Sequence, residues 1–159
     1  MGLLNYTTKI DPDKTAAEIA RCLSMHGAQA VLTEYDPEGG YVSALSFKIL
    51  LKGQPMGFRL PCDWRPVLEI LTKGKKRPPA WDERRLAVWE GQHRDQAVRT
   101  AWRIVKDWVE AQMALVETQM VTTQDVFLPY MVLGNNQTLA EKVRESPQFL
   151  LGAPGDNRE

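Results

Sequence analysis

The sequence has little of what marks the easily recognised classes of protein. Among its 159 residues there are only two cysteines, Cys22 and Cys62. They form neither a Cys-x-x-Cys pair nor a disulfide framework, which favours a reducing setting. No apolar run approaches the about 18 consecutive residues that a membrane-spanning helix needs, and the first residues lack the pattern of a signal peptide. We therefore expect a cytoplasmic protein that makes no contact with a membrane.

Motifs for catalysis and for cofactor binding are also missing. The two histidines, His26 and His93, have no cysteine or histidine at ligand spacing, so a zinc site is not expected. The acidic residues Glu34, Asp36 and Glu38 share one turn, where we expect them to be solvated rather than to converge on a cation. The chain has no Gly-x-Gly-x-x-Gly or Walker sequence for nucleotide phosphates. We therefore expect no cofactor, no metal ion and no catalytic residue, and an enzyme is the least favoured of three alternatives.

The net charge is zero, because 20 basic residues balance 20 acidic ones, but the two signs are separated along the chain. Residues 1–72 carry a net charge of −1, residues 73–104 one of +5 and residues 105–159 one of −4. Such asymmetry within a chain points to charged partners. The balanced total therefore does not exclude nucleic acid as a partner of the middle segment.

The first 72 residues predict a strand, a helix and an antiparallel meander. Residues 5–10 are rich in β-formers and indicate a strand. A helix is expected at 12–26, because Asp11 offers an N-cap, Pro12 suits the first turn and Gly27 suits the end. Alternating apolar residues then predict three strands at 30–35, 41–51 and 56–60.

Helices dominate the second part of the chain, after a short helix that Asp63 can cap. The segment 73–80 contains glycine, two prolines and four basic residues, so we expect an exposed basic loop. Apolar residues with a period near 3.6 predict a long amphipathic helix at 94–120. Short capped pieces follow at Thr122-x-x-Asp125 and Thr138-x-x-Glu141. The sequence thus predicts one α+β domain at 1–151, followed by a disordered tail at 152–159.

Three segments resemble a family of small proteins encoded by bacteriophages, prophages and related mobile elements. The segments are Phe58-Arg59-Leu60-Pro61, the helical string Ala101–Gln112, and Val126-Phe127-Leu128-Pro129-Tyr130-Met131. The resemblance covers most of the chain, and the helical string is its most specific part. It implies a cytoplasmic accessory protein of a bacterial host cell, acting in DNA replication or recombination or against host defence. The family has no known activity or site residues to carry over.

The basic segment at and after the predicted loop is the main candidate for a binding site. Lysine and arginine neutralise phosphates, and interleaved tryptophans can stack on unpaired bases, which contributes about 1–3 kcal/mol per base. We therefore expect non-enzymatic binding of nucleic acid, with single-stranded DNA as the leading candidate. The expected contacts are Lys73, Lys75, Lys76, Arg77, Trp81, Arg84, Arg85, Trp89, Arg99 and Arg103.

Two other interpretations of these features remain open. The basic segment can be a solvated loop whose tryptophans pack against the core. The long helix can instead make the chain a protein-binding module, because tryptophan is enriched at interaction hot spots. Such a module would bind a host or phage protein, for instance as an inhibitor of a host defence complex, or form a homo-oligomer through residues 94–120. In the oligomer, the basic segment of one subunit would meet the acidic C-terminal third of another.

Overall fold

A three-stranded antiparallel sheet forms the centre of the molecule, with the strands in the order β1-β2-β3. A computed structural model describes residues 2–148, and the predicted tail at 152–159 lies outside them. The strands are β1 (Ala30–Tyr35), β2 (Val42–Leu51) and β3 (Gln54–Arg59). The helices are α1 (Pro12–Met25), α2 (Arg65–Thr72), α3 (Glu83–Glu117), α4 (Thr123–Phe127) and α5 (Leu139–Glu145), with the 3₁₀ helix η1 (Leu128–Tyr130). The predicted α+β class and the three-stranded meander are confirmed.

The turn between β2 and β3 sets the register of this hairpin. Lys52 and Gly53 both have positive φ, of 50° and 79°. Two such residues form the kind of turn whose twist matches that of paired strands. Phe47 consequently lies opposite Phe58, and their rings stack with centroids 5.2 Å apart. The hairpin thus aligns the aromatic side chains of the core.

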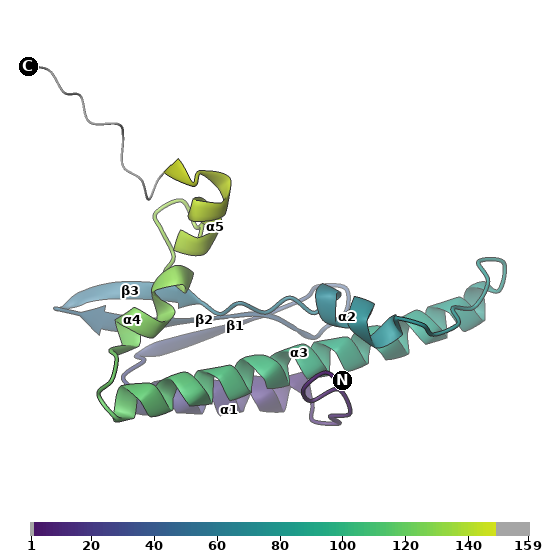
Figure 1. Cartoon of the computed structure of the whole chain (residues 1–159), viewed down its shortest axis with the longest axis horizontal. Coiled ribbons are helices and arrows are strands. Elements are labelled where there is room, and N and C mark those ends of the chain that lie inside the picture. Colours follow the sequence, from purple (N-terminus) through teal and green to yellow (C-terminus); the bar gives the residue numbers. More distant parts are fainter. Residues whose placement is uncertain (1, 149–159) are drawn as a thin grey trace, which may run out of the picture.

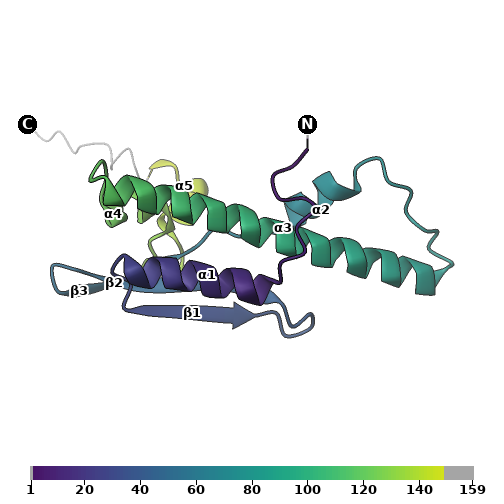
Figure 2. The ribbon, with the colours of Figure 1, turned by 90° about the horizontal axis from the view of Figure 1, so that it is seen from below.

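One face of the sheet holds that core. Leu45 and Phe47 of β2 are buried because alternate side chains of a strand point to the same face. Helices α1 and α3 lie side by side over this face (Figures 1 and 2). Trp102 of α3 is the largest fully buried side chain, and its indole N–H donates to the carbonyl of Val42 at 2.9 Å.

Helix α3 is longer than the sequence pattern predicts. Its 35 residues begin well before the predicted start at residue 94. Gly91 does not interrupt it, because a single glycine costs only about 1 kcal/mol in a helix. The side chain of Asp82 caps the first turn by accepting the N–H of Arg85 at 3.2 Å. Met120, the last residue of the predicted helix, lies beyond the actual end at Glu117 and is 70% exposed.

Residues 5–10 form no strand, contrary to the prediction. Asn5 has a φ of 61°, and its side chain donates to Asp107 of α3 at 2.7 Å. Gln96, also of α3, donates to the carbonyl of Thr8 at 3.0 Å. No strand within residues 2–148 lies beside this segment, and β propensity alone does not make a strand without a partner.

The short C-terminal elements follow α3, and the segment between α4 and α5 runs beside β3, at one edge of the sheet, while α5 stands away from it (Figure 1). Both predicted capping boxes are confirmed: Thr122 with Asp125 begins α4, and Thr138 with Glu141 begins α5. Between these helices, the N–H of Val132 donates to the carbonyl of Gly57 at 2.8 Å. The chain thereby covers part of the β3 edge.

A basic arm as candidate nucleic-acid interface

One part of the molecule projects beyond the sheet and its covering helices. It consists of the loop 73–82 and the first turns of α3, residues 83–96, and we call residues 73–96 the arm. Figures 1 and 2 show α2 leading into this loop, which runs out to the start of α3. The first buried residue of α3 is Ala97. Apart from Gln96 at its end, which donates to the carbonyls of Tyr6 and Thr8, the arm is therefore held mainly by its own contacts.

Two pairs of side chains tie the loop to the helix. Arg77 forms an ion pair with Glu90, and Nζ of Lys75 lies 3.3 Å from Nε2 of His93. His93 is fixed in turn by Trp89, whose carbonyl lies 2.7 Å from Nδ1 and whose ring centroid lies 4.2 Å from that of the imidazole. Exposed ion pairs contribute only about 0–1 kcal/mol each. The loop can therefore exchange these contacts for contacts with a ligand.

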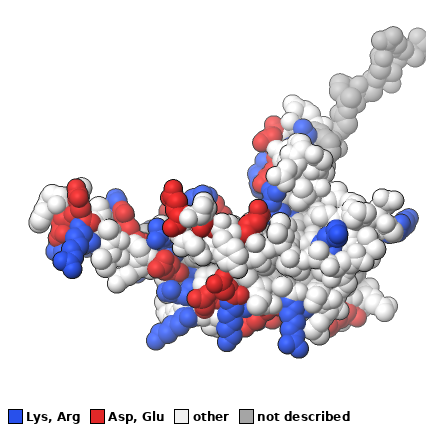
Figure 3. Space-filling view, turned by 180° about the vertical axis from the view of Figure 1, so that it is seen from behind, with Lys and Arg blue, Asp and Glu red and all other residues white. Residues whose placement is uncertain are grey.

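The arm carries more positive than negative charge, and Figure 3 shows both signs on it at the left of the view. Its basic residues are Lys73, Lys75, Lys76, Arg77, Arg84, Arg85 and Arg94, and its acidic residues are Asp82, Glu83, Glu90 and Asp95. Lys73, Lys76 and Arg84 are exposed, and no carboxylate of the described residues forms an ion pair with them. These three side chains are available to a polyanion.

The stability of α3 does not explain the charges at its start. Arg84 and Arg85 lie in the first turn, where a positive charge opposes the helix dipole at a cost of about 0.3–1 kcal/mol. Arg85 is compensated by Asp82, whose carboxylate lies 3.6 Å from its guanidinium. Arg84 has no such compensation among the described residues. The stability of the helix therefore gives no reason for the charge of Arg84.

Trp81 is exposed at the junction of the loop and α3. Its side chain is 83% exposed, the largest value among the big apolar residues that the structure describes. Tryptophan is usually largely buried, because its indole ring has a large apolar surface. The N–H of Asp82 donates to the carbonyl of Pro79 at 3.0 Å, which closes the turn around Trp81. The backbone turn thus places the ring at the junction of the loop and α3 with its surface open to solvent.

Two predicted contact residues do not belong to this surface. Arg103 forms an ion pair with Glu18 of α1, and its side chain is only 13% exposed. Arg99 donates to Oε1 of Gln96 at 2.7 Å, and its Nε is buried without a hydrogen-bond partner among the described residues. The side of α3 that carries these two residues faces α1 and the N-terminal segment rather than solvent. The other eight predicted residues lie in the arm, although Trp89 is partly buried beside His93.

The apolar stripe of α3 is not a free surface. Val98, Val105 and Val109 are buried together with Trp102 between α1, α3 and the sheet. A homo-oligomer formed through this stripe, at 94–120, would have to displace the protein's own core.

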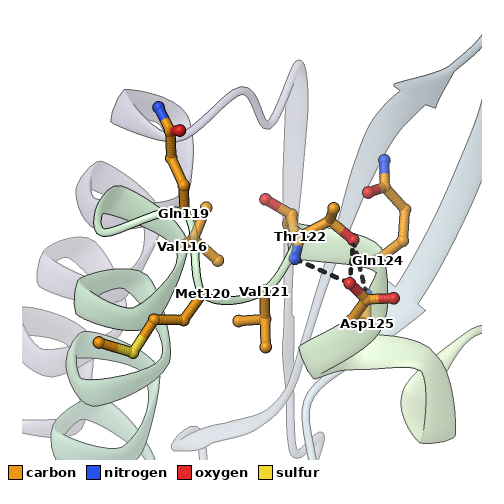
Figure 4. A pocket seen from close by; sticks show the side chains of 8 residues that line it. Val116, Gln119, Met120, Val121, Thr122, Gln124 and Asp125 are labelled. Carbon is orange, nitrogen blue, oxygen red and sulfur yellow. Dashed lines mark hydrogen bonds between the residues drawn. The ribbon is translucent and has the colours of Figure 1, made fainter.

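A hollow lies where α3 turns into α4 (Figure 4). Val116, Gln119 and Met120 line one side of it, and Thr122 and Asp125 line the other. The hydroxyl of Thr122 donates to Asp125 at 2.7 Å and its backbone N–H does so at 2.8 Å, and both bonds lower the pKa of this carboxyl. Thr122 and Asp125 are thus used to cap α4, and we assign the hollow no function.

The residues most suited to metal binding or nucleophilic chemistry are buried or bonded within the fold. Among the described residues, no group of three or more metal-ligating side chains converges. Burial raises the pKa of Cys62 to about 12, so its thiol stays protonated. Nε2 of His26 lies 2.8 Å from Glu117 of α3, and His93 supports the loop of the arm. A search for ligand spacing does not reveal this role of His93, although its spacing of four residues from Trp89 places both on one helix face.

Comparison with known proteins does not assign a family to the chain. No model of a protein family matches it, and neither the curated proteins nor the solved structures gave a significant match. Within residues 2–148, no helix is both long enough and apolar enough to span a bilayer. The chemistry of the arm is therefore the basis on which a function can be assigned.

Proposed function

We propose that this protein binds single-stranded nucleic acid through the arm, with DNA as its first candidate ligand and without catalysing a reaction. The resemblance to phage-encoded proteins suits an accessory role of this kind. The observation that carries the proposal is the exposed Trp81 between the basic loop and the basic start of α3. A single strand offers unpaired bases that an indole can stack on, whereas a duplex keeps its bases stacked inside.

Some basic side chains of the arm must break an ion pair before they can bind a phosphate, and others need not. Lys73, Lys76 and Arg84 can reach phosphates without losing an ion pair present in the described residues, whereas Arg77 must first leave Glu90. We therefore expect the three unpaired side chains to supply most of the electrostatic attraction, with Trp81 adding the contact to a base.

The length of the arm sets the size of the site. Its helical part, residues 83–96, is about 20 Å long at a rise of 1.5 Å per residue. A stacked strand advances about 3.4 Å per nucleotide. The arm therefore accommodates about six nucleotides, and oligonucleotides shorter than this should bind more weakly.

Fluorescence anisotropy with a labelled oligonucleotide of about 20 nucleotides tests the proposal. We expect binding at about 50 mM salt that weakens steeply as salt is added, because the release of counterions drives it. A duplex of the same sequence should bind less tightly than the single strand. Absence of single-strand binding at about 50 mM salt would disprove the proposal.

A pair of matched charge reversals locates the site. Lys73→Glu with Lys76→Glu should weaken binding. It should also reduce the slope of log K against log salt concentration by at least about 1.4, because each phosphate contact to a single strand contributes about 0.7. The control is Lys14→Glu with Arg21→Glu on the exposed side of α1, which changes the net charge equally. Basic side chains also project from the side of the molecule that the helices cover (Figure 3). This control therefore distinguishes the effect of charges on the arm from the effect of the total charge. An equal loss in both variants would contradict a site on the arm.

Trp81 provides a second measurement. Stacking on a base quenches indole fluorescence, so an oligonucleotide should quench the native protein and have much less effect on the Trp81→Phe variant. That variant should still bind, because a phenyl ring also stacks. Quenching of the same size in both proteins would exclude Trp81 from the contact.

A further inference from the structure

Within the described residues, the chain covers part of one edge of the sheet and leaves the other edge open. At β3, Met131 forms an isolated bridge with Phe58, and the N–H of Val132 donates to Gly57. At β1, no segment within residues 2–148 pairs with the outer edge. The six residues of β1 therefore present a row of unpaired backbone groups.

Strand β1 also lacks the features that usually prevent an open edge from pairing. Natural edges carry prolines, lysines or strong bulges, whereas β1 reads Ala-Val-Leu-Thr-Glu-Tyr, with Glu34 as its single charge. Leu32, in its middle, lies on the face away from the core and is 59% exposed. The one irregularity falls between Glu34 and Tyr35, at the end of the strand. The regular part is thus open to a second strand.

The hydrogen-bond ladder fixes which backbone groups of β1 are free. The N–H of Leu60 donates to Leu45, so the odd-numbered residues of β2 bond to the β3 side and the even-numbered ones to β1. Leu32 is paired with an even-numbered residue of β2, so Val31 and Thr33 direct their N–H and C=O groups to the open edge. An antiparallel copy of β1 that bonds at these two residues places Leu32 opposite its own equivalent.

In this register the two copies also complement each other in charge. Glu34 of one copy lies opposite Ala30 of the other, and Ala30 is paired with Lys48 of its own β2. All three side chains are on the outer face of the sheet. Glu34 and the Lys48 of the other copy are then two strand spacings apart, about 10 Å. Their extended side chains span this distance over the small Ala30, and symmetry forms the pair twice.

The helices that cover the sheet leave room for a second copy to reach the β1 edge. Helix α1 covers β1 and β2, and Glu18 and His26 mark its side toward α3, because both bond to that helix. Residues two positions away lie about 200° around the helix, on the opposite side. These are Ala20 and Ser24. Their small side chains leave room for α1 of a second copy at the usual 8–10 Å between helix axes.

We propose that two copies of this chain join their β1 edges about a twofold axis perpendicular to the sheet. The result is a continuous six-stranded sheet with Leu32 at the axis and both helical layers on one face. The two arms then point in opposite directions. A six-residue edge buries less than the about 1,200 Å² of a standard interface, so the dimer forms reversibly as concentration rises.

Sedimentation velocity without nucleic acid, from about 1 μM to about 1 mM, tests this proposal. The native chain should change from the monomer mass of 18.0 kDa toward twice that mass. Glu34→Lys should weaken dimerisation about tenfold, because the new lysine faces Lys48 of the other copy, and Lys48→Glu should weaken it equally. The double variant, Glu34→Lys with Lys48→Glu, should restore the native dimerisation.

The charge swap distinguishes a specific dimer from a loss of folding. Both positions are exposed, and circular dichroism checks that each variant keeps its secondary structure. A native chain that stays monomeric at about 1 mM overturns the proposal. So does a dimer that resists both single reversals, or one that the double variant fails to restore.

Discussion

Helix α3 crosses two regions of the molecule that hold it in different ways. From Ala97 to Met113 its inward side chains are buried in the core, whereas no residue from Glu83 to Gln96 is buried. The part from Ala97 to Met113, the body half, is fixed by burial of apolar surface. The part from Glu83 to Gln96, the arm half, is fixed by one cap and a few exposed contacts. Continuity of a helix therefore does not imply uniform stability. The arm half can open locally while the body half opens only when the protein unfolds.

The largest expected effect contrasts one tryptophan from each region. Trp102→Ala should lower the free energy of unfolding by about 3–5 kcal/mol, because it leaves a cavity in the core and removes the bond to Val42. Trp81→Ala should change it by less than about 0.5 kcal/mol, because the ring is exposed. Urea titration of both variants measures the difference. Similar losses would show that the arm is part of the cooperative core.

For binding to a single strand, a large effect is expected at Trp81. Trp81→Ala should weaken single-strand binding about 5- to 150-fold, which corresponds to the loss of one stacked base. Lys52→Glu, in the turn between β2 and β3 and away from the arm, should change it much less. Anisotropy titration at one fixed salt concentration makes the comparison. Unchanged affinity in Trp81→Ala would remove the main support for the proposed site.

A smaller effect is expected from stiffening the arm alone. Gly91→Ala should stabilise its helix by about 0.5–1 kcal/mol, and an added Cβ at this position meets no atom within 4 Å. Amide hydrogen exchange in residues 84–92 should slow about 2- to 5-fold. Exchange in the buried part of α3, at 98–109, should not change. Equal slowing in both parts would mean that they open together.

The smallest effect depends on pH and lies at the other end of α3. The carbonyl of Cys22 and the carboxylate of Glu117 both bond to His26 and raise its pKa, while burial opposes this. The protonated form is favoured by folding, so the contribution is complete below the unfolded pKa of about 6.5 and is lost as pH rises through the folded value. Glu117→Gln should lower stability by a few tenths of a kcal/mol at about pH 5.5 and by less at about pH 8. A larger loss at the higher pH would contradict this pairing.

The parts of the fold that could be predicted from the sequence are those determined locally. The cap at Asp11, the turn at Lys52-Gly53 and the alternation in β2 depend on residues a few positions apart. The false strand at 5–10 shows the limit of such signals, because a strand also needs a partner that local sequence does not specify. The early start of α3 does not follow from the apolar stripe, because residues 83–96 bury no side chain and depend on the cap at Asp82 and the contacts of the loop.

The candidate site shows the same division. A segment with two prolines and four basic residues cannot pack into a core, so the exposure of Lys73 and Lys76 followed from composition. Excluding Arg99 and Arg103 requires knowing which side of α3 faces α1, and an apolar stripe marks only the side toward the core. That Trp81 is exposed while Trp102 is buried likewise depends on how far α3 extends beyond the sheet.

The direction of α3 has an electrical consequence. Its N-terminal end carries the basic arm, and its C-terminal part carries Asp107, Glu110 and Glu117 against a single lysine after residue 104. These charges add to the dipole of the helix, which is positive at the N-terminus, over a length of about 52 Å. Helix α3 is therefore a long electric dipole, and the field of the proposed single strand would turn it so that the arm arrives first. This orientation raises the association rate at low salt and is lost when the screening length falls well below the length of the helix.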